Sequence, residues 1–292
     1  MNDNVAVVME LLHRWLTRQL SDAAARWFAE KLGELQSKPT DRTLFFAISL
    51  VPRKIGKDDL TLDNADFADA HHARRGWTPV GWSVDQAARL LLLLSAGGSD
   101  EQFARRLEQL CLTADVGELV TFYRGLPLYP AQQQYVRRAA EGVRTNMKAV
   151  FEAVAHHNPY PAEQLDEGAW NQMVLKALFI GSRLQPIVGL DRRSNPTLMR
   201  MLCDYAHERW AAHRDVSPEL WRCVGPHADD AALADLERVL NEGSEREREA
   251  SVLALSACPH PRGPTLLATV PELVARVKRG QLSWDILGGP TP

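Results

Sequence analysis

Helix-capping signals recur along this chain and constrain its fold more than any other feature. A Ser followed three residues later by Gln or Glu stands before three apolar stretches, at Ser83–Gln86, Ser99–Gln102 and Ser244–Glu247. In such a capping box the Ser side chain accepts a free backbone N–H at the start of a helix, and the Gln or Glu side chain accepts the N–H of the Ser. We therefore expect a helix to begin directly after each of these serines.

The rest of the chain follows a helical period as well. Apolar residues recur at three- and four-residue spacing, the pattern of a helix that buries one face, and we find no alternation typical of a strand. Short connections join most of the helices, so we predict an all-α fold, an irregular α-solenoid or HEAT-like array of antiparallel helix pairs. The expected helices span 4–20, 41–51, 62–74, 84–95, 100–112, 115–124, 131–142, 146–157, 163–179, 230–241, 244–257 and 271–280.

The length of 292 residues suits one elongated domain, which we place at 1–287. Its expected parts are the N-terminal helices in 1–160, a central region in 161–228 and a HEAT-like C-terminal hairpin in 229–287, where a polar helix precedes an Ala- and Leu-rich one. The tail, 288–292, is expected to be disordered.

The stretch from Trp170 to Arg214 contains the two strongest helices. In the first, Trp170, Met173, Val174, Ala177 and Leu178 form one apolar face, while Leu175 and Phe179 lie outside it. The second begins at Asn195 and Pro196, because Asn caps a helix N-terminus and Pro has no N–H to leave unpaired there. Both helices are apolar on two sides, so we expect both to be packed on two sides.

The turn between these helices carries three arginines, Arg183, Arg192 and Arg193. Free backbone N–H groups at the start of a helix, together with arginines, would hold a phosphate or a carboxylate. The alternative is that Asp191 and Asn195 act as caps and that the arginines pair with nearby carboxylates, which is the commoner fate of charged residues.

Two further groups of polar residues invite a functional interpretation. A helix over 62–74 would bring Asp63, Asp66, Asp69, His71 and His72 close together, but the spacing matches no metal motif, and an exposed polar helix would look the same. His156 and His157 end a helix, where a histidine favours the helix dipole. We assign no metal ligand and no catalytic residue from either group.

Composition excludes several classes of protein. The formal net charge of −3 argues against a nucleic-acid or anionic-membrane surface, and the apolar run Leu90–Leu94 is far too short to span a bilayer. The first residues show no signal-peptide pattern. The four cysteines form no C-x-x-C pair, so we expect no zinc site, no redox motif and a cytoplasmic location.

The central stretch and its continuation resemble the EboA family of bacterial metabolite-traffic proteins. The resemblance rests on Trp170–Gln172, Val174–Phe179, Tyr205–Ala212, Arg214 and Pro218–Arg222. Elsewhere the similarity is one of length and helical character only. These are not catalytic motifs, so the resemblance transfers no active-site residue and implies no cofactor.

The resemblance implies partners and a setting. The expected partners are other Ebo proteins: a prenyltransferase-like membrane protein, a TatD-like metal hydrolase, a dehydroquinate-synthase-like enzyme and a sugar-phosphate-isomerase-like enzyme. That set is linked to making or moving a secondary-metabolite precursor, with export of the scytonemin monomer as the best-known association. A small-molecule metabolite is a further expected ligand.

Three hypotheses follow for the function. The first is a non-catalytic binding or scaffold protein, because no nucleophile–base pair, phosphate loop or metal motif is visible. The second is an enzyme acting on a polar or phosphorylated metabolite, with Glu208 or His213 as acid or base and arginines holding an anion. The seven residues that would converge in this enzyme are Lys176, Arg183, Arg192, Arg193, Glu208, His213 and Arg214. The third is a protein–protein adaptor in which the charged central residues only stabilise the fold. We favour the first.

The candidate ligand-binding residues all lie in the central stretch. Its tryptophans have two interpretations, as core anchors or as surfaces on which a planar metabolite stacks, and the first is the commoner. The candidates are Trp170, Asn171, Lys176, Arg183, Arg192, Arg193, Glu208, Trp210, His213 and Arg214.

Overall fold

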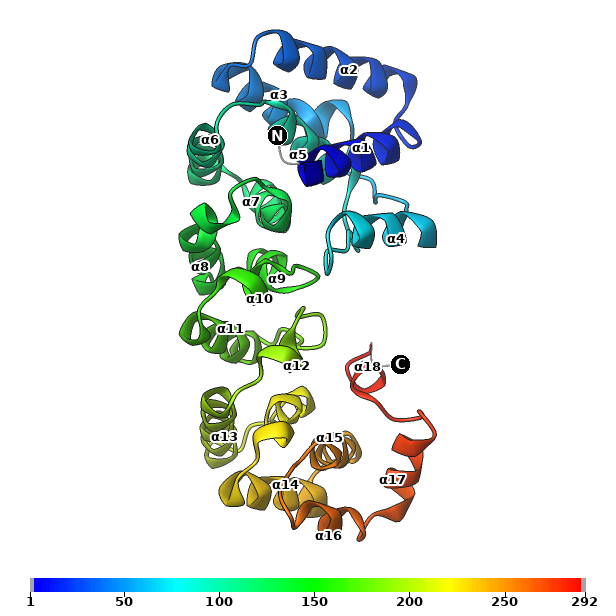
Figure 1. The fold of residues 1–292 in the computed structure, drawn as a ribbon, viewed down its shortest axis with the longest axis vertical. Helices are drawn as coiled ribbons and strands as arrows, with labels where there is room; N and C mark the ends of the chain where they lie inside the picture. The colour runs from blue at the N-terminus through cyan, green and yellow to red at the C-terminus, as the bar shows by residue number, and fades with distance from the viewer. Residues whose placement is uncertain (1–2, 290–292) are drawn as a thin grey trace. The chain divides into compact units, whose positions relative to one another are not determined.

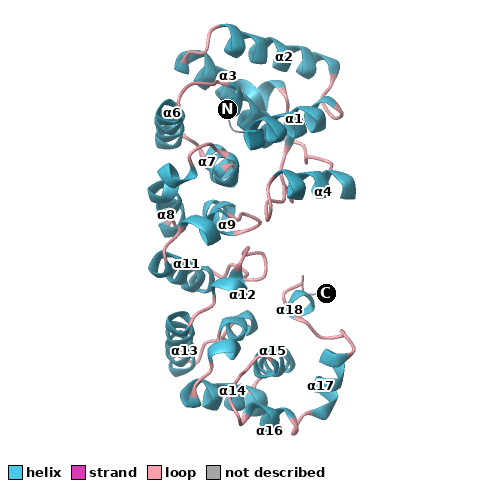
Figure 2. Cartoon of the chain, viewed as in Figure 1, coloured by secondary structure: helices cyan, strands magenta, loops and turns pink. Residues whose placement is uncertain are grey.

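Helices account for 71% of the chain in the computed structural model, which describes residues 3–289 (Figure 1). Within that range there is no strand, and the β-pairing is limited to one isolated antiparallel bridge between Asp59 and Ser83 (Figure 2). The all-α prediction is confirmed.

The chain divides into two compact units, Met1–Leu165 and Asp166–Pro292. The division falls inside the region 161–228 that the sequence analysis treats as one piece. The single domain over 1–287 stays a prediction. Of the expected disordered tail, Gly288 and Gly289 are described and donate backbone hydrogen bonds to the carbonyls of Trp284 and Ile286, whereas 290–292 lie outside the described residues.

In the first unit, α5 forms the centre. Every residue from Leu90 to Leu94 is buried, as expected for a helix that is apolar all round, and α1, α2, α3 and α7 pack against it. The elements of this unit, with 3₁₀ helices labelled η, are α1 (Asp3–Thr17), α2 (Asp22–Ser37), α3 (Asp41–Lys54), α4 (Asn64–Ala73), α5 (Val84–Ser95), α6 (Asp100–Thr113), α7 (Val116–Arg124), η1 (Leu126–Leu128), η2 (Gln132–Tyr135), α8 (Val136–Arg144), α9 (Lys148–Ala155) and α10 (Tyr160–Gln164).

A segment that carries α4 leaves the helical array between α3 and α5. It is closed at its base, where the N–H of Leu60 donates to the carbonyl of Trp82 at 2.8 Å and the N–H of Val84 donates to the carbonyl of Asp58 at 2.9 Å. α4 packs against α1, where Trp15 Nε1 donates to the buried Asp66 carboxylate at 2.9 Å.

In the second unit, α15 forms the centre. Its residues from Glu249 to Leu255 are buried, and α14, α16, α17, α18 and both 3₁₀ helices pack against it. The elements are α11 (Glu167–Phe179), α12 (Leu190–Arg193), α13 (Pro196–Ala211), η3 (Pro218–Cys223), η4 (Gly225–His227), α14 (Asp230–Glu242), α15 (Glu245–Ser256), α16 (Gly263–Leu267), α17 (Pro271–Lys278) and α18 (Trp284–Leu287).

The capping predictions are confirmed at two of three positions. Ser99–Gln102 and Ser244–Glu247 form capping boxes. Ser83 precedes a helix as expected, but its side chain accepts no backbone N–H, and its hydroxyl donates to the Asp85 carboxylate at 2.5 Å. Two further boxes use Asp in place of Ser and begin at Asp63 and Asp115.

The two central helices differ from their expected bounds in one place. The helix expected over 163–179 begins only at Glu167, because the Asp166 side chain caps it by accepting the N–H of Ala169 at 2.7 Å. The second helix begins as expected, with the Asn195 side chain accepting the N–H of Leu198 at 2.8 Å.

Burial on α11 and α13 also follows the sequence only in part. The predicted apolar face of α11 is buried throughout. On α13 one stripe is buried through Met199, Cys203 and Ala206, whereas on the other Met201 and Tyr205 are half-buried. Toward the end of the helix Trp210 is half-buried, and Ala212 and His213 are exposed. The last turn of α13 therefore has an open side.

Candidate functional site

A groove lies between α11 and α13, on faces that neither helix buries in the core. On each helix the groove is lined by residues at i, i+3, i+4 and i+7, the spacing of a single helix face. The hollow has a volume of about 700 Å³. We call it the α11–α13 groove, and it is lined by Gln172, Leu175, Lys176, Phe179, Tyr205, Glu208, Arg209, Ala212 and Arg214.

The apolar part of this groove comes from Leu175, Phe179 and Tyr205. Leu175 and Tyr205 are half-buried, but Phe179 is 71% exposed, which is unusual for a side chain of that size. The Lys176 ammonium lies 5.4 Å from the centroid of the Phe179 ring, at cation–π distance. An aromatic ring and a positive charge therefore stand side by side on α11.

The charged part of the groove has three cations and one carboxylate. Arg209 donates from Nε to the carbonyl of Asp215 at 2.9 Å. Within residues 3–289, the side chains of Glu208 and Arg214 form neither a hydrogen bond nor an ion pair. With Lys176, the formal charge of the lining is positive by two.

His213 sets the position of Arg214 through the backbone. The N–H of Arg214 donates to the carbonyl of Arg209 at 2.9 Å, and the N–H of His213 donates to the carbonyl of Trp210 at 3.0 Å. This pair of bonds is the Schellman motif, which needs a left-handed residue at the position that His213 occupies. His213 has a φ of 51°, although glycine is the residue that adopts this conformation at low cost.

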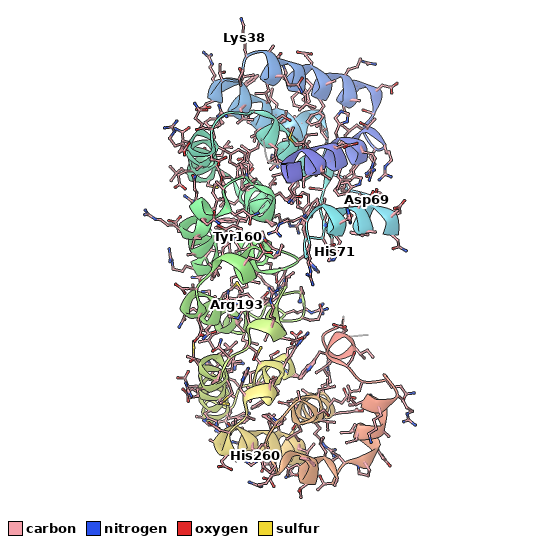
Figure 3. The ribbon with its side chains drawn as sticks, in the orientation of Figure 1. Lys38, Asp69, His71, Tyr160, Arg193 and His260 are labelled. Carbon is pink, nitrogen blue, oxygen red and sulfur yellow. The ribbon has the colours of Figure 1, made fainter. Side chains whose placement is uncertain are left out.

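The predicted ligand residues Trp170 and Asn171 lie in the core, away from the groove. Trp170 is fully buried, and the guanidinium of Arg193 (labelled in Figure 3) lies 4.8 Å from its ring centroid. Asn171 exchanges two amide hydrogen bonds with Asn195, at 3.2 and 2.9 Å. The first contact joins α11 to the end of α12 and the second joins α11 to the start of α13, so all four side chains pack within the fold.

Trp210 is in contact with other protein groups. Its ring stacks on Trp221 with centroids 5.9 Å apart and an angle of 24°, and the guanidinium of Arg238 lies 4.3 Å from it. His207 lies beside the same ring, and its Nε2 is 2.7 Å from the Asp235 carboxylate. This cluster joins α13 to η3 and α14.

The remaining predicted arginines do not line the groove. Arg183 lines a different hollow of about 440 Å³, together with Arg246 and Glu219. Arg192 is exposed on α12, and the neighbouring Asp191 forms a two-point ion pair with Arg222, at 2.6 and 2.7 Å.

The N-terminus of α13 is already occupied by its own residues. The Asn195 side chain takes the N–H of Leu198, and Pro196 has no N–H to offer. The Asn195 cap agrees with the alternative interpretation of the turn, but Asp191 does not cap this helix and pairs with Arg222, which lies outside the turn. Of the ten predicted ligand residues, the groove brings together Lys176, Glu208 and Arg214.

The α4 residues also serve the fold. Asp66 accepts from Trp15 and pairs with Arg18, and Asp69 pairs with Arg14; Figure 3 shows Asp69 and His71 on α4. No group of three or more His, Cys, Asp or Glu side chains able to hold a metal ion is found within residues 3–289. The helix expected to reach His157 ends at Ala155, so His156 and His157 lie just beyond α9, and His157 has a left-handed φ of 52°.

Burial controls the chemistry of three of the four cysteines. It raises the pKa of Cys203 and of Cys223 to about 12, and that of Cys111 likewise to about 12. A thiol must lose its proton to act as a nucleophile. These three side chains are therefore protonated at neutral pH and suit a core position.

The groove residues that sequence reasoning missed are Leu175, Phe179, Tyr205, Arg209, Gln172 and Ala212. A signal for the first two was present, because both lie outside the buried face of their helix. Tyr205 and Arg209 fall on an apolar stripe of α13 and were expected to pack. Which off-face residues would face each other across a groove depends on how the two helices are placed, which periodicity does not supply.

None of the helices within residues 3–289 combines the length and the apolar character needed to cross a membrane. No curated protein and no solved structure matches the chain. A family model described as metabolite traffic protein EboA matches residues 8–225, which include α11, α12, α13 and every residue of the groove. Because this match covers most of the chain, the protein belongs to the EboA family.

Proposed function

We propose that this EboA-family chain is a non-catalytic binding protein that holds a small metabolite in the α11–α13 groove. It acts with other Ebo proteins in the synthesis or transport of a secondary-metabolite precursor, and the membrane partner is of the prenyltransferase-like kind. The family description, metabolite traffic, supports the general role. The groove is the observation that carries the proposal for this chain.

The groove has the properties of a small-molecule site. Sites for such ligands have volumes of roughly 300–1,000 Å³ and combine apolar walls with a few polar groups. The α11–α13 groove has a volume of about 700 Å³, an exposed aromatic ring at Phe179 and polar groups on both helices. Because it lies on the side of the helices opposite to their cores, a ligand would enter without unfolding either helix.

The proposal extends to the arrangement of the helices. We propose that consecutive helix pairs form an irregular α-solenoid with HEAT-like repeats. The packing of α14 against α15, with Ser251 Oγ donating to the carbonyl of Leu236 at 2.7 Å, supports this for one pair. Arrays of this kind present extended surfaces to partners, which suits a scaffold for several Ebo proteins.

A binding role fits the lining better than a reaction does. The seven residues of the enzyme hypothesis are divided, because Lys176, Glu208 and Arg214 line the groove while Arg183, Arg192, Arg193 and His213 do not. General acid–base chemistry needs a titratable group held close to the reacting atoms. Glu208 is the groove's one carboxylate, and it is an exposed side chain on a helix surface.

Native mass spectrometry tests the proposal. The full chain would be co-expressed with the other proteins of its cluster, purified under native conditions and analysed for retained small molecules and bound proteins. We expect a retained small molecule that is lost in Phe179→Ala. The control is Ile286→Ala, which removes another exposed apolar side chain of the same unit, outside the groove. Absence of any retained molecule would count against the proposal.

The adaptor hypothesis predicts a different result. In that case a protein partner is retained without a small molecule, and Phe179→Ala leaves the complex unchanged. Substitution of Arg193 and Arg214 would then lower thermal stability without altering any ligand response. For Arg193 the contact with the Trp170 ring, at 4.8 Å, is the observation that favours a purely structural role.

A further inference from the structure

The lining of the α11–α13 groove has more positive than negative side chains. Lys176, Arg209 and Arg214 contribute three positive charges, and Glu208 contributes one negative charge. Because Glu208 forms no ion pair within residues 3–289, it does not neutralise these cations by direct contact. Arg209 donates to a backbone carbonyl, which leaves its charge in place. Arg209 and Arg214 alone outnumber Glu208, and the groove therefore attracts an anionic group.

The apolar surface lies next to this charge on both helices. On α11, Phe179 is 71% exposed and the Lys176 ammonium is 5.4 Å from its ring centroid. On α13, Tyr205 lies one turn before Arg209 and donates its hydroxyl to the Leu178 carbonyl at 3.4 Å, so its ring is held against α11. A molecule in contact with Phe179 and Tyr205 thus has cations within reach on two sides.

The same lining disfavours other classes of ligand. A cationic molecule would meet three positive charges. A molecule with two or more acidic groups spread along the groove would meet Glu208, and like charges repel at this distance. A neutral apolar molecule would cover charged side chains without offering them a partner, and this desolvation opposes binding.

We propose that the ligand of this groove is a small apolar molecule that carries a single acidic group. The apolar body lies on Leu175, Phe179 and Tyr205, and the acidic group lies between Lys176 and Arg214. This inference rests on the proposed function, because it names the ligand class of the same groove. It adds that charge, and not apolar contact alone, selects the ligand.

Two fluorescent probes separate these contributions. The first, 1-anilinonaphthalene-8-sulfonate, has an apolar ring system and one sulfonate, and N-phenyl-1-naphthylamine has the same rings without the sulfonate. Each would be titrated into the full chain at low salt. We expect the sulfonate to bind about tenfold more tightly, since each exposed ion pair contributes about 0.2–1 kcal/mol and two act together.

The variants assign this difference to the groove. Lys176→Gln combined with Arg214→Gln removes the preference for the sulfonate and does not weaken binding of the neutral probe, because fewer charged side chains are then covered. The control is Lys278→Gln with Arg279→Gln, which removes two exposed cations of the same unit, outside the groove; it leaves both probes unaffected. Phe179→Ala weakens both probes, whereas Ile286→Ala weakens neither.

The outcomes distinguish the two proposals. Equal affinity for the two probes, with both weakened by Phe179→Ala, would overturn the acidic ligand class and leave the proposed binding function intact. A preference for the sulfonate that survives the Lys176 and Arg214 substitutions would likewise overturn the ligand class. If Phe179→Ala changes the binding of neither probe, both the ligand class and the groove as a binding site fail.

Discussion

The variant Gly225→Ala tests a close approach of two backbone segments in the second unit, at Gly225 and Ala254. A Cβ atom at Gly225 would lie 2.3 Å from the carbonyl oxygen of Ala254 and 2.7 Å from its Cα, whereas real Cβ atoms essentially never come within 3.0 Å of another heavy atom. The required shift is therefore roughly 0.7 Å, the difference between 3.0 and 2.3 Å. Because the obstacle is backbone in the buried centre of α15, no side chain can rotate to relieve it.

The expected cost of Gly225→Ala follows from this geometry. Adding atoms to a well-packed core destabilises by about 1–3 kcal/mol, and a backbone obstacle places this case at the upper end. The loss of conformational freedom in the unfolded chain opposes it by about 0.4–1 kcal/mol. We expect a net loss of about 2 kcal/mol in the free energy of unfolding.

Urea denaturation of the full chain and hydrogen exchange of the α15 amides measure this loss. The matched control is Gly168→Ala, since Gly168 is exposed in the first turn of α11 and a Cβ there would meet only Asp166 Oδ1, at an ordinary 3.6 Å. That variant stabilises by about 0.5 kcal/mol, because alanine is the better helix former. A Gly225→Ala protein as stable as the wild type, with unchanged exchange in α15, would refute the reasoning.

Three further predictions concern the same unit. The Glu219 carboxylate accepts hydrogen bonds from the backbone N–H groups of Leu184 at 2.9 Å and Gln185 at 2.8 Å. In Glu219→Gln one of these N–H groups faces an amide NH₂ and loses its acceptor, so the free energy of unfolding falls by about 2 kcal/mol. Hydrogen exchange at these two amides should accelerate, and unchanged exchange would contradict this. In His213→Gly the left-handed φ of 51° is no longer strained, so the free energy of unfolding rises by about 0.5–1 kcal/mol. The thermal midpoint should rise with it, and a lower midpoint would contradict this prediction. Burial raises the pKa of the Cys223 thiol to about 12. As pH rises above about 8.5, the thiol therefore loses its proton in the unfolded state before it does so in the folded state. Its contribution to stability is fully present below that pH and is lost as the pH rises toward 12. Urea titrations at pH 8 and pH 10 should show a smaller pH dependence for Cys223→Ala than for the wild type.

The sequence predicts buried helix faces well, because a helix that buries one face carries apolar residues at three- and four-residue spacing. Leu90 to Leu94 are apolar on every side and are buried at the centre of the first unit. Trp170 and Trp221 are fully buried, as the core-anchor interpretation holds. Helix starts are equally readable where a side chain caps its own helix, as at Asn195.

The groove was harder to predict, for a physical reason. Trp170 was a candidate because a planar metabolite could stack on its ring, but both Trp170 and the adjacent Asn171 are buried in the core. In a helix, neighbouring residues point to different sides, so Asn171 is buried while Gln172 lines the groove. Two factors decide which residues meet in the groove: the helix face on which each residue lies, and the position of the second helix. Only the helix face can be derived from the sequence.

The segment between α3 and α5 leaves the helical array and rejoins it at the same place. There, backbone hydrogen bonds join Leu60 to Trp82 and Val84 to Asp58. Because hydrogen bonds hold the two ends of this segment together, a change in its length does not move the ends of α3 and α5 apart. Changes in the length of its loops therefore leave the contact of α3 with α5 in place, whereas α4 itself is tied to α1 by the bond from Trp15 to Asp66. In this respect the loops on either side of α4 are the exchangeable part, and variation among family members should concentrate there before it reaches the helices.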